Sequence, residues 1–203
     1  MVCFVRHGTT PTTGKVLPGR AKGLHLAERG LEEADRVGAR LAALGSVRAV
    51  YASPLERTTE TARPIARRLG LRVRAERGLL ECDFGAWTGV DLASLAKKPE
   101  WATVQRNPSG FRFPSGESFL EMQARMTSAL ARLVEWHRGE TVVAVSHADP
   151  IKAVVAQAAG TPLDLFQRLT VAPCSVSALA YTGHGPFVLT VNSTDSLSAL
   201  AIA

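Results

Sequence analysis

An arginine, a histidine and a glycine, Arg6-His7-Gly8, come directly after the short apolar run of residues 2–5. A neutral imidazole is a good nucleophile near pH 7 because its unperturbed pKa is about 6.5, whereas a serine hydroxyl needs a separate base. His7 is therefore suited to attack a phosphoryl group directly. Gly8 lets the backbone lie close to the ring, and three hydroxyl donors follow it: Thr9, Thr10 and Thr13.

Two later segments have the same shape, an apolar run followed by a side chain suited to phosphate. Residues 47–52 lead to Arg57, and residues 141–145 lead to His147. Phosphoryl transfer places charge on the equatorial oxygens, so the guanidinium groups of Arg6 and Arg57 and the second imidazole are suitable electrostatic clamps. With these clamps no Mg²⁺ is required, and we expect neither a metal ion nor a cofactor.

The alkoxide that leaves a phosphate ester needs a proton. A carboxylic acid beside a bound phosphate has its pKa raised by the like charge, which suits it to donate that proton. Glu81 is the candidate acid, with Asp83 and Asp149 in reserve. Asp149 precedes Pro150, and this position favours a helix N-cap over a substrate contact.

These side chains meet only if their strands are parallel neighbours, because ligands bind beyond the carboxyl ends of the strands in an open parallel sheet. Apolar and β-branched runs predict strands, and apolar residues at helical spacing predict helices. The strands are expected at 2–5, 47–52, 72–75, 141–145, 176–181 and 187–192, and the main helices at 28–44, 54–63, 117–137 and 149–159.

Two local signals mark the ends of the second helix. Residues 53–56 are interpreted as a capping box with Ser53 as the N-cap. Arg57 then lies in the first turn, where the free N–H groups and the positive end of the helix dipole add to its charge. Pro64 should kink or end this helix near Arg63.

The chain has 203 residues, of which 46% are hydrophobic, enough to bury one sheet with helices on both faces. We expect an α/β fold, a three-layer sandwich with a mostly parallel sheet, as a single domain over residues 1–203. A Pro-interrupted segment at about 86–115 predicts a small cap insert of short helices and loop. Specificity is expected from residues 11–22 and from this cap, where Arg106 and Arg112 suggest contact with a second anionic group.

The net charge of +6 suits anionic ligands but is spread along the chain. Three cysteines without metal-ligand spacing indicate reduced thiols of the cytosol. The start of the chain has no charged leader, and no apolar stretch approaches a membrane span of about 20 residues. We expect a cytoplasmic protein with a small phosphorylated substrate, without nucleic-acid or membrane partners; the oligomeric state, a homodimer included, stays open.

Taken together, the motifs resemble the histidine phosphatase superfamily, the phosphoglycerate-mutase-like proteins. The segments that carry the resemblance are RHGTT at 6–10, SPLERTTETA at 53–62, Glu81 with FGAWTG at 84–89, PSGES at 114–118 and VSH at 145–147. They fall in the family's order and span residues 1 to about 150. The resemblance implies an α/β fold, a phosphohistidine on His7, phosphate contacts from Arg6, Arg57 and His147, and Glu81 as proton donor and later activator of water.

Three features depart from the family's pattern. Thr13 stands where many members have asparagine, and Ala148-Asp149-Pro150 follows the second histidine where many have glycine. The acid-phosphatase branch has an aspartate directly after that histidine, whereas Asp149 comes one position later, so its donor role is not transferred. The mutases are usually longer, and this compact chain looks more like the phosphatases. The candidate substrate contacts are Gly8, Thr9, Thr13, Arg20, Ser118 and Asp149.

The sequence therefore predicts a metal-independent phosphatase of small phosphomonoesters. A cofactor-dependent phosphoglycerate mutase, in which the phosphohistidine returns to a bound acceptor, is the alternative enzyme. A catalytically silent module that binds a phosphorylated ligand is the alternative from another class, and nucleic-acid binding is the weakest hypothesis. The residues do not determine which phosphomonoester is the substrate.

Overall fold

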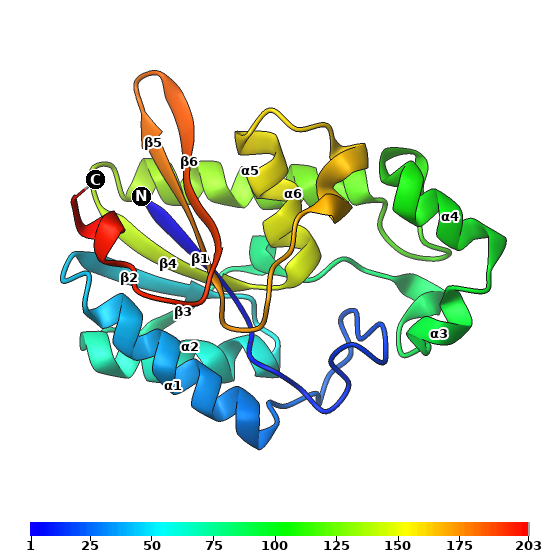
Figure 1. The fold of residues 1–203 in the computed structure, drawn as a ribbon, viewed down its shortest axis with the longest axis horizontal. Helices are drawn as coiled ribbons and strands as arrows, with labels where there is room; N and C mark the ends of the chain where they lie inside the picture. The colour runs from blue at the N-terminus through cyan, green and yellow to red at the C-terminus, as the bar shows by residue number, and fades with distance from the viewer. Residues whose placement is uncertain (203) are drawn as a thin grey trace.

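One six-stranded sheet forms the centre of the computed structural model, which describes the backbone of residues 1–202 and the side chains of residues 1–200. The strands lie in the order β3-β2-β4-β1-β5-β6 (Figure 1). Their bounds are β1 Val2–Arg6, β2 Val47–Ala52, β3 Val73–Ala75, β4 Thr141–Ser146, β5 Val176–Thr182 and β6 Gly185–Ser193. Each strand expected from the sequence is present, to within three residues at either end.

The three strands that carry the candidate site are adjacent and parallel, as predicted. β4 lies between β1 and β2, and Val2 opposes Val142 while Arg6 opposes Ser146. β4 is buried along its whole length and is apolar except at its ends, which is the pattern of a strand covered on both faces. β5 and β6 continue the sheet as antiparallel strands.

Helices cover both faces of the sheet (Figure 1). α1 (Glu28–Ala42) and α2 (Glu56–Leu69) lie on one face, and α5 (Phe119–Trp136) and α6 (Ala148–Ala158) on the other. Side chains alternate along β1, so Cys3 and Val5 join one apolar cluster and Val2 and Phe4 the other. The predicted α/β sandwich with a mostly parallel sheet is confirmed.

The capping box predicted at residues 53–56 is wrong, and so is an end of the second helix near Arg63. α2 begins at Glu56 with Leu55 as N-cap, and Ser53 does not cap it, because the Ser53 hydroxyl lies against the ring of His147. Pro64 does not end the helix, which continues to Leu69. A proline inside a helix costs about 3 kcal/mol, and the complete burial of Ile65 just after it helps to offset that cost.

Short helices at one end of the sheet form the region expected as a cap (Figure 1). They are η2 (Gly85–Trp87), α3 (Leu92–Leu95), α4 (Pro99–Arg106) and η3 (Pro108–Gly110). Trp87, Phe111 and Phe113 pack with ring centroids 5.0–5.5 Å apart, so these aromatic rings serve packing within the region. The N-terminal loop is tied to this region by Leu17, which exchanges backbone hydrogen bonds with Gly89 and Val90.

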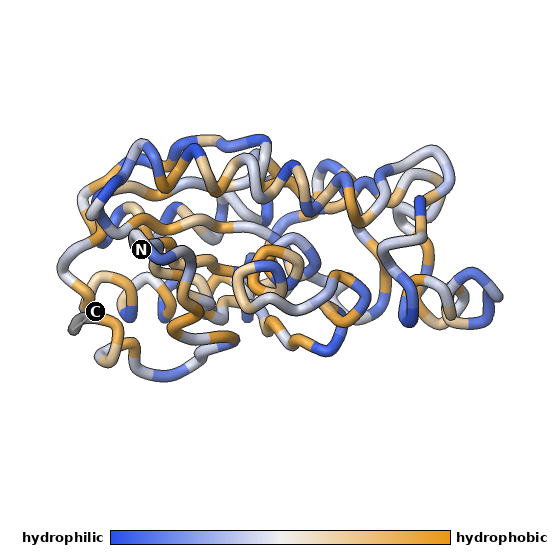
Figure 2. Tube along the Cα trace, turned by 90° about the horizontal axis from the view of Figure 1, so that it is seen from above, coloured by the Kyte–Doolittle hydropathy of each residue, from blue (hydrophilic) through white to orange (hydrophobic). Residues whose placement is uncertain are grey.

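Apolar residues gather on the strands and on the inner turns of the helices, with polar residues outside (Figure 2). Within residues 1–202, the helices are too short or too polar for any of them to cross a bilayer.

Glycine is required where α1 crosses the loop behind His7. A Cβ on Gly30 would lie 2.1 Å from the Thr9 carbonyl oxygen, closer than any real contact. We expect Gly30→Ala to lower the free energy of unfolding by about 1–3 kcal/mol and to reduce activity, because the chain next to His7 must move. Gly183→Ala is the matched control, since its Cβ would meet nothing within 4 Å. Urea unfolding measures both, and equal stabilities would contradict the prediction.

Candidate active site

The two histidines meet at the carboxyl ends of β1 and β4. The backbone N–H of His7 donates to the Ser146 carbonyl over 2.9 Å, which continues the strand pairing to the end of the sheet. The rings of His7 and His147 then lie edge to face with centroids 5.3 Å apart. Parallel pairing has therefore brought together residues that are distant in sequence.

His7 is held as a neutral imidazole with one free nitrogen. Its Nδ1 lies 2.8 Å from the Gly8 carbonyl oxygen, which can only accept, so Nδ1 carries the proton and Nε2 keeps its lone pair. Burial holds the pKa of His7 well below its ordinary value, and the charges of Arg57 and Arg6 lower it further. A neutral ring with an exposed lone pair is the form needed for nucleophilic attack.

Arg6 and Arg57 present buried N–H groups that are not satisfied among the described residues. Arg57 is fully buried and donates one Nη2 bond, 2.7 Å, to the Gly19 carbonyl, while its Nε and Nη1 have no partner there. Arg6 donates Nη1 to the Val171 carbonyl over 2.7 Å and leaves Nε unpaired. Buried donors without acceptors cost about 1–3 kcal/mol each, so this arrangement favours an anion that accepts from them.

His147 completes the set of donors. Its Nε2 lies 2.9 Å from the Ser53 hydroxyl, and its Nδ1 has no hydrogen-bond partner in residues 1–200. Burial, followed by the charge of Arg57, holds the pKa of His147 well below its usual range. If the hydroxyl donates to Nε2, the proton of the neutral ring lies on Nδ1, the nitrogen left to donate to a ligand.

We expect Ser53→Ala to lower kcat/KM about tenfold. The substitution removes the group that selects the tautomer and orientation of His147, and one hydrogen bond contributes about 1 kcal/mol. Ser128→Ala is the control, because Ser128 donates only to a carbonyl on the exposed side of α5. Steady-state kinetics on an aryl phosphate tests this, and equal rates for the two variants would contradict the role of Ser53.

Glu81 lies beside the histidines as a buried acid. Its Oε2 is 3.9 Å from Nδ1 of His147, and its Oε1 accepts from the Cys82 N–H over 3.0 Å. Burial, and after it the charge of Asp149, raises the pKa of Glu81 to about 7. Its backbone carbonyl accepts from Arg20 and Arg125, at 2.9 and 3.3 Å. Glu81 is therefore a fixed carboxyl group that is ready to give or take a proton near neutral pH.

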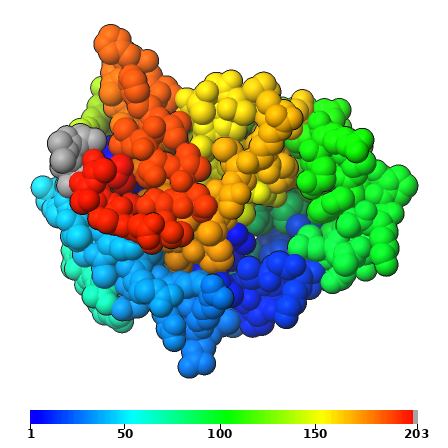
Figure 3. Space-filling view, in the orientation of Figure 1, coloured from blue at the N-terminus to red at the C-terminus, as the bar shows by residue number. Residues whose placement is uncertain are grey.

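A pocket of about 240 Å³ opens above Arg6, His7 and Glu81, while Arg57 and His147 are fully buried beside these residues and do not line it. Figure 3 shows the hollow between the N-terminal loop in blue, the yellow and orange segments, and the cap in green. The lining residues are Arg6, His7, Thr10, Thr13, Gly14, Val16, Leu17, Pro18, Glu81, Phe84, Leu92, Ala148, Asp149 and Lys152. A hollow of this volume holds several waters, which is enough space for a small ligand.

Some of the predicted substrate contacts line this pocket, and others have partners elsewhere. Thr13 and Asp149 line it. Thr9 instead gives its hydroxyl and N–H to Glu33. Gly8 lies behind His7, where its N–H donates to Thr61.

Two other predicted contacts are used elsewhere in the fold. Arg20 has Nη2 2.8 Å from a Glu117 oxygen. Ser118 forms the capping box of α5 with Glu121. Neither is among the residues that line the pocket, and both have partners within the fold.

Asp149 is not the N-cap that the sequence favoured. α6 begins at Ala148 with His147 as its N-cap, and Asp149 lies in the first turn. Its carboxylate is 3.5 Å from Nζ of Lys152.

Sequence reasoning missed four residues around the site. Ser53 orients His147, Thr61 accepts from the Gly8 N–H, and Glu33 holds Thr9. Lys152 adds a cation to the pocket wall. The motif around residues 53–62 contains two of them, but its polar residues also fit helix capping, so only contacts between segments could identify their partners.

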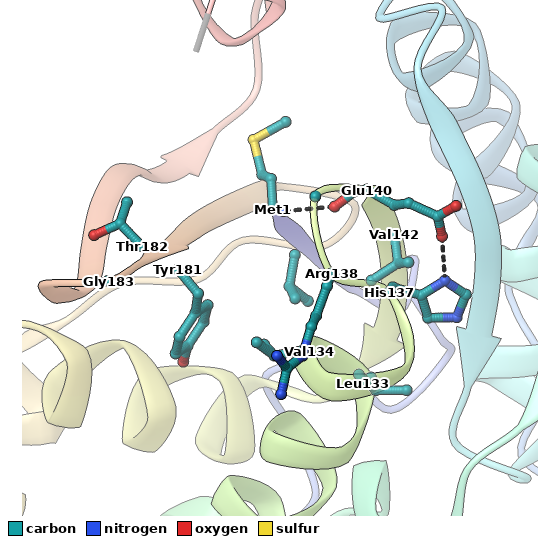
Figure 4. A pocket seen from close by; sticks show the side chains of 12 residues that line it. Met1, Leu133, Val134, His137, Arg138, Glu140, Val142, Tyr181, Thr182 and Gly183 are labelled. Atoms are coloured by element: carbon teal, nitrogen blue, oxygen red, sulfur yellow. Dashed lines mark hydrogen bonds and ion pairs between the residues drawn. The ribbon is translucent and has the colours of Figure 1, made fainter.

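A second hollow, of about 390 Å³, lies at the amino ends of β1 and β4 (Figure 4). There His137 pairs with Glu140 at 2.7 Å, and Arg138 pairs with Glu135. Its charged side chains are thus already compensated, in contrast to the buried donors beside His7. The unsatisfied donors therefore favour an active site at the carboxyl ends of the strands.

Comparisons with known proteins agree with this geometry. A bifunctional protein of Mycobacterium tuberculosis is 32% identical over 202 residues, which cover 96% of this chain and 54% of that protein. The chain thus spans about half the length of the mycobacterial relatives it matches. The "probable phosphoglycerate mutase GpmB" of Klebsiella pneumoniae is 33% identical over 183 residues, 89% of this chain and 84% of that protein.

Solved structures share the fold. A mycobacterial glucosyl-3-phosphoglycerate phosphatase superposes with a TM-score of 0.86 at 24% identity, covering 95% of this chain and 99% of that one. A phosphoserine phosphatase of Entamoeba histolytica, in complex with 3-phosphoglyceric acid, gives a TM-score of 0.85 at 23% identity over 96% and 97%. The model of the histidine phosphatase superfamily (branch 1) matches residues 2–194. With two facing histidines at the carboxyl ends of a parallel sheet, this chain belongs to the histidine phosphatase superfamily, branch 1.

Proposed function

We propose that this protein is a metal-independent phosphatase of small phosphomonoesters that works through a phosphohistidine on His7. The observation that carries the proposal is the set of buried N–H donors left unsatisfied in the described residues around that ring: Nε of Arg6, Nε and Nη1 of Arg57, and Nδ1 of His147. Donors of this kind match the oxygens of a phosphoryl group. The two guanidinium charges balance a phosphate dianion, so its charge needs no additional cation.

In the first step, Nε2 of His7 attacks phosphorus in line with the ester oxygen. A P–N bond forms and the P–O bond to the alcohol breaks, while the arginines hold the equatorial oxygens. Glu81, in its acid form, gives its proton to the departing oxygen, and the alcohol leaves. Because the raised pKa of Glu81 is about 7, a large share of the free enzyme holds that proton at neutral pH.

In the second step, water attacks the phosphohistidine. Glu81, now a carboxylate, takes a proton from the water as its oxygen bonds to phosphorus. The P–N bond breaks, its electron pair returns to Nε2 of His7, and inorganic phosphate leaves. The acid form of Glu81 is thereby regenerated, and the cycle is closed without another proton source.

The direct test combines turnover with trapping of the intermediate. We expect hydrolysis of 4-nitrophenyl phosphate that is unchanged by excess EDTA. We also expect a phosphoryl label on the denatured protein that is lost in acid and stable in alkali, and that peptide mapping locates at His7. Activity that depends on a metal ion, or a label on another residue, would overturn the proposal.

The loss of activity in Glu81→Gln should depend on how strongly the leaving group needs a proton. We expect kcat/KM for an alkyl phosphate to fall about 10²–10⁴-fold, because the alkoxide leaves without a proton, and the value for 4-nitrophenyl phosphate to fall much less. Asp83→Asn is the matched control, since Asp83 contacts Arg20 at 3.6 Å and does not line the pocket.

The pH profile follows from the same carboxyl group. In the wild type, kcat/KM for the alkyl phosphate should decrease as pH rises through about 7, because Glu81 loses its proton. That alkaline limb should be absent in Glu81→Gln. A limb that persists at the same pH in the variant would assign the titration to another group.

A phosphoglycerate mutase is the second candidate, and similarity to GpmB over 84% of that protein favours it. In a mutase, the phosphoryl group on His7 passes to a bound acceptor. Interconversion of 2- and 3-phosphoglycerate, stimulated by bisphosphoglycerate and faster than release of inorganic phosphate, would decide for the mutase. Measurable phosphate binding with no turnover of either kind would indicate a binding module.

We further propose that the chain acts as one domain in the cytoplasm and that residues 86–115 form the cap over the substrate. Leu92 of this segment lines the pocket, and the short loop 14–18 lines the same wall. Apolar side chains therefore meet the part of the substrate that carries no phosphate. A phosphometabolite panel tests which alcohols fit.

A further inference from the structure

We propose that Arg125 is a positioning residue for the proton donor: it fixes the backbone of residues 78–81, and through that backbone the carboxyl group of Glu81. This inference rests on the proposed function and adds to it a residue that touches no substrate. Arg125 lies on α5 and is not among the residues that line the pocket. It therefore acts on the reaction through the segment that it holds.

The guanidinium of Arg125 uses all of its donors inside the fold. Its Nη1 donates to the carbonyls of Gly78 and Leu80, over 2.7 and 3.0 Å, and its Nη2 donates to the Glu81 carbonyl over 3.3 Å. Its Nε and Nη2 donate to the two carboxylate oxygens of Glu117, over 2.9 and 3.0 Å. Arginine has five N–H donors, and these contacts occupy each of them. No donor remains for a ligand, so the contacts hold the chain around Arg125.

The segment that Arg125 contacts has little regular structure of its own. Just after the short η1 (Arg77–Leu79), residues 80–84 form neither helix nor strand. Side chains hold this backbone instead, because the Leu79 carbonyl accepts from the Ser146 hydroxyl over 2.7 Å and the other three carbonyls of 78–81 accept from Arg125. Buried carbonyls need such partners, and here α5 and β4 supply them to four consecutive residues.

Gly78 lets the segment pack directly against α5. A Cβ at Gly78 would lie 2.3 Å from the Cβ of Ala129, which is one helical turn beyond Arg125. A larger residue would have to move away from the helix. The close approach therefore keeps the carbonyls within reach of the guanidinium.

Glu117 extends the contact to the other side of Glu81. Its Oε2 accepts from the Asp83 N–H over 3.1 Å, and its own N–H donates to the Asp83 carbonyl over 2.8 Å. Burial by itself would raise the pKa of Glu117, but the hydrogen bond and the charge of Arg125 hold that pKa below its ordinary value. The ionised carboxylate thus links Arg125 to the backbone that follows the acid.

The carboxyl group of Glu81 depends on this backbone for its position. Its Oε1 accepts from the N–H of the next residue, Cys82, over 3.0 Å, and its Oε2 lies 3.9 Å from Nδ1 of His147, beyond hydrogen-bond distance. A shift of the segment therefore moves the acid with it. A displacement of about 1 Å at the reacting atoms can cost about 10²-fold in rate.

The test compares two substrates that differ in how strongly the leaving group needs a proton, sn-glycerol 3-phosphate and 4-nitrophenyl phosphate. Arg125→Lys keeps the charge that balances Glu117, but an ammonium cannot replace five N–H donors in one plane. We expect kcat/KM for sn-glycerol 3-phosphate to fall about 10- to 100-fold, mainly through kcat. The value for 4-nitrophenyl phosphate should stay within a few-fold of wild type, so the ratio of the two values reports the position of the acid.

A double-mutant cycle with Glu81→Gln separates positioning of the acid from a general effect on the site. Because Arg125 acts through Glu81, Arg125→Lys should have little further effect on sn-glycerol 3-phosphate once the acid is removed. The same loss with and without Glu81 would overturn the inference. Equal losses for the two substrates would also overturn it.

Two further variants control for charge and folding. Arg132→Lys, on the same helix, should leave the ratio unchanged, because Arg132 pairs with the carboxylate of Glu76 at 3.0 Å rather than with the carbonyls of residues 78–81. Arg125→Met combined with Glu117→Gln removes both charges of the pair and leaves no buried charge unpaired. If thermal unfolding shows that Arg125→Lys does not fold, this double variant decides: a lowered ratio supports the inference, and an unchanged ratio rejects it.

The outcomes distinguish this inference from the proposed function. A wild type that hydrolyses both substrates, with a ratio that Arg125→Lys leaves unchanged, overturns the role of Arg125 and leaves the phosphatase standing. A wild type that hydrolyses no phosphomonoester overturns the phosphatase, and the role of Arg125 in its proton transfer falls with it.

Discussion

His7→Ala is expected to reduce kcat on 4-nitrophenyl phosphate by ~10⁴-fold or more, since the variant lacks the atom that forms the covalent intermediate. The expected loss is larger than for any other side chain of the site. The acid-labile phosphoryl label should disappear in the same variant. Rapid-quench experiments with labelled substrate measure both effects on one preparation.

Binding of inorganic phosphate should survive in His7→Ala. The donors of Arg6, Arg57 and His147 remain, and the ring of His7 donates its only proton to Gly8. Phosphate should therefore still raise the midpoint of thermal unfolding, as any ligand of the native state does. Full turnover in His7→Ala would end the phosphohistidine mechanism, and loss of phosphate binding together with turnover would point to a misfolded site.

Arg57→Lys is expected to lower kcat/KM about 10²–10³-fold although it keeps the charge. The guanidinium of Arg57 holds two unsatisfied donors, Nε and Nη1, in one rigid plane while its Nη2 donates to the Gly19 carbonyl. A lysine ammonium cannot reproduce this planar pair of donors, and removing one pre-organised donor from a reacting oxyanion costs about 2.7–4 kcal/mol. Steady-state kinetics measures the loss.

Arg57→Met separates function from folding. The variant loses one hydrogen bond, worth about 1 kcal/mol, but also removes two buried donors that each cost about 1–3 kcal/mol when unpaired. We expect its free energy of unfolding to equal or exceed that of the wild type in phosphate-free buffer, while phosphate no longer stabilises it. The control is Arg63→Met, on the exposed side of the same helix. Strong destabilisation of Arg57→Met without phosphate would show that this arginine serves the fold.

Glu81, like the unpaired donors of Arg57, is expected to lower the stability of the folded protein. Its pKa rises on folding, to about 7, so the folded state favours the protonated form. The native state is therefore destabilised as pH rises from the unfolded value through about 7, and Glu81→Gln should remove that part of the pH dependence. The environment of Glu81 therefore lowers the stability of the native state, and it keeps a proton available on the carboxyl group near neutral pH.

The sheet and the position of its site could be predicted because their signals are local. The apolar runs before Arg6 and His147 indicate buried strands from their own composition, and parallel strands place their following residues at one edge. The helix at residues 28–42 was also evident from its apolar spacing. Pro64 was misjudged because its local cost is offset by packing against distant residues.

Polar side chains with several potential partners could not be predicted in this way. Ser53 was predicted to cap a helix and Ser118 to contact the substrate, yet Ser53 orients His147 and Ser118 caps α5. Arg20 had the charge for a substrate contact, but Glu117 engages it. Each hydroxyl or guanidinium binds the partner that folding brings nearest, and no spacing within one segment identifies that partner.

The sequence by itself determined the family, the strand ends that carry His7 and His147, and the chemistry that an imidazole between arginines can perform. Only the tertiary structure decided that Glu81 has a pKa near 7, that Arg57 keeps two donors free, and that Lys152 lies in the pocket wall. The physical reason is that residue type and period are properties of a segment, whereas burial, unsatisfied donors and charge balance arise from the packing of several segments.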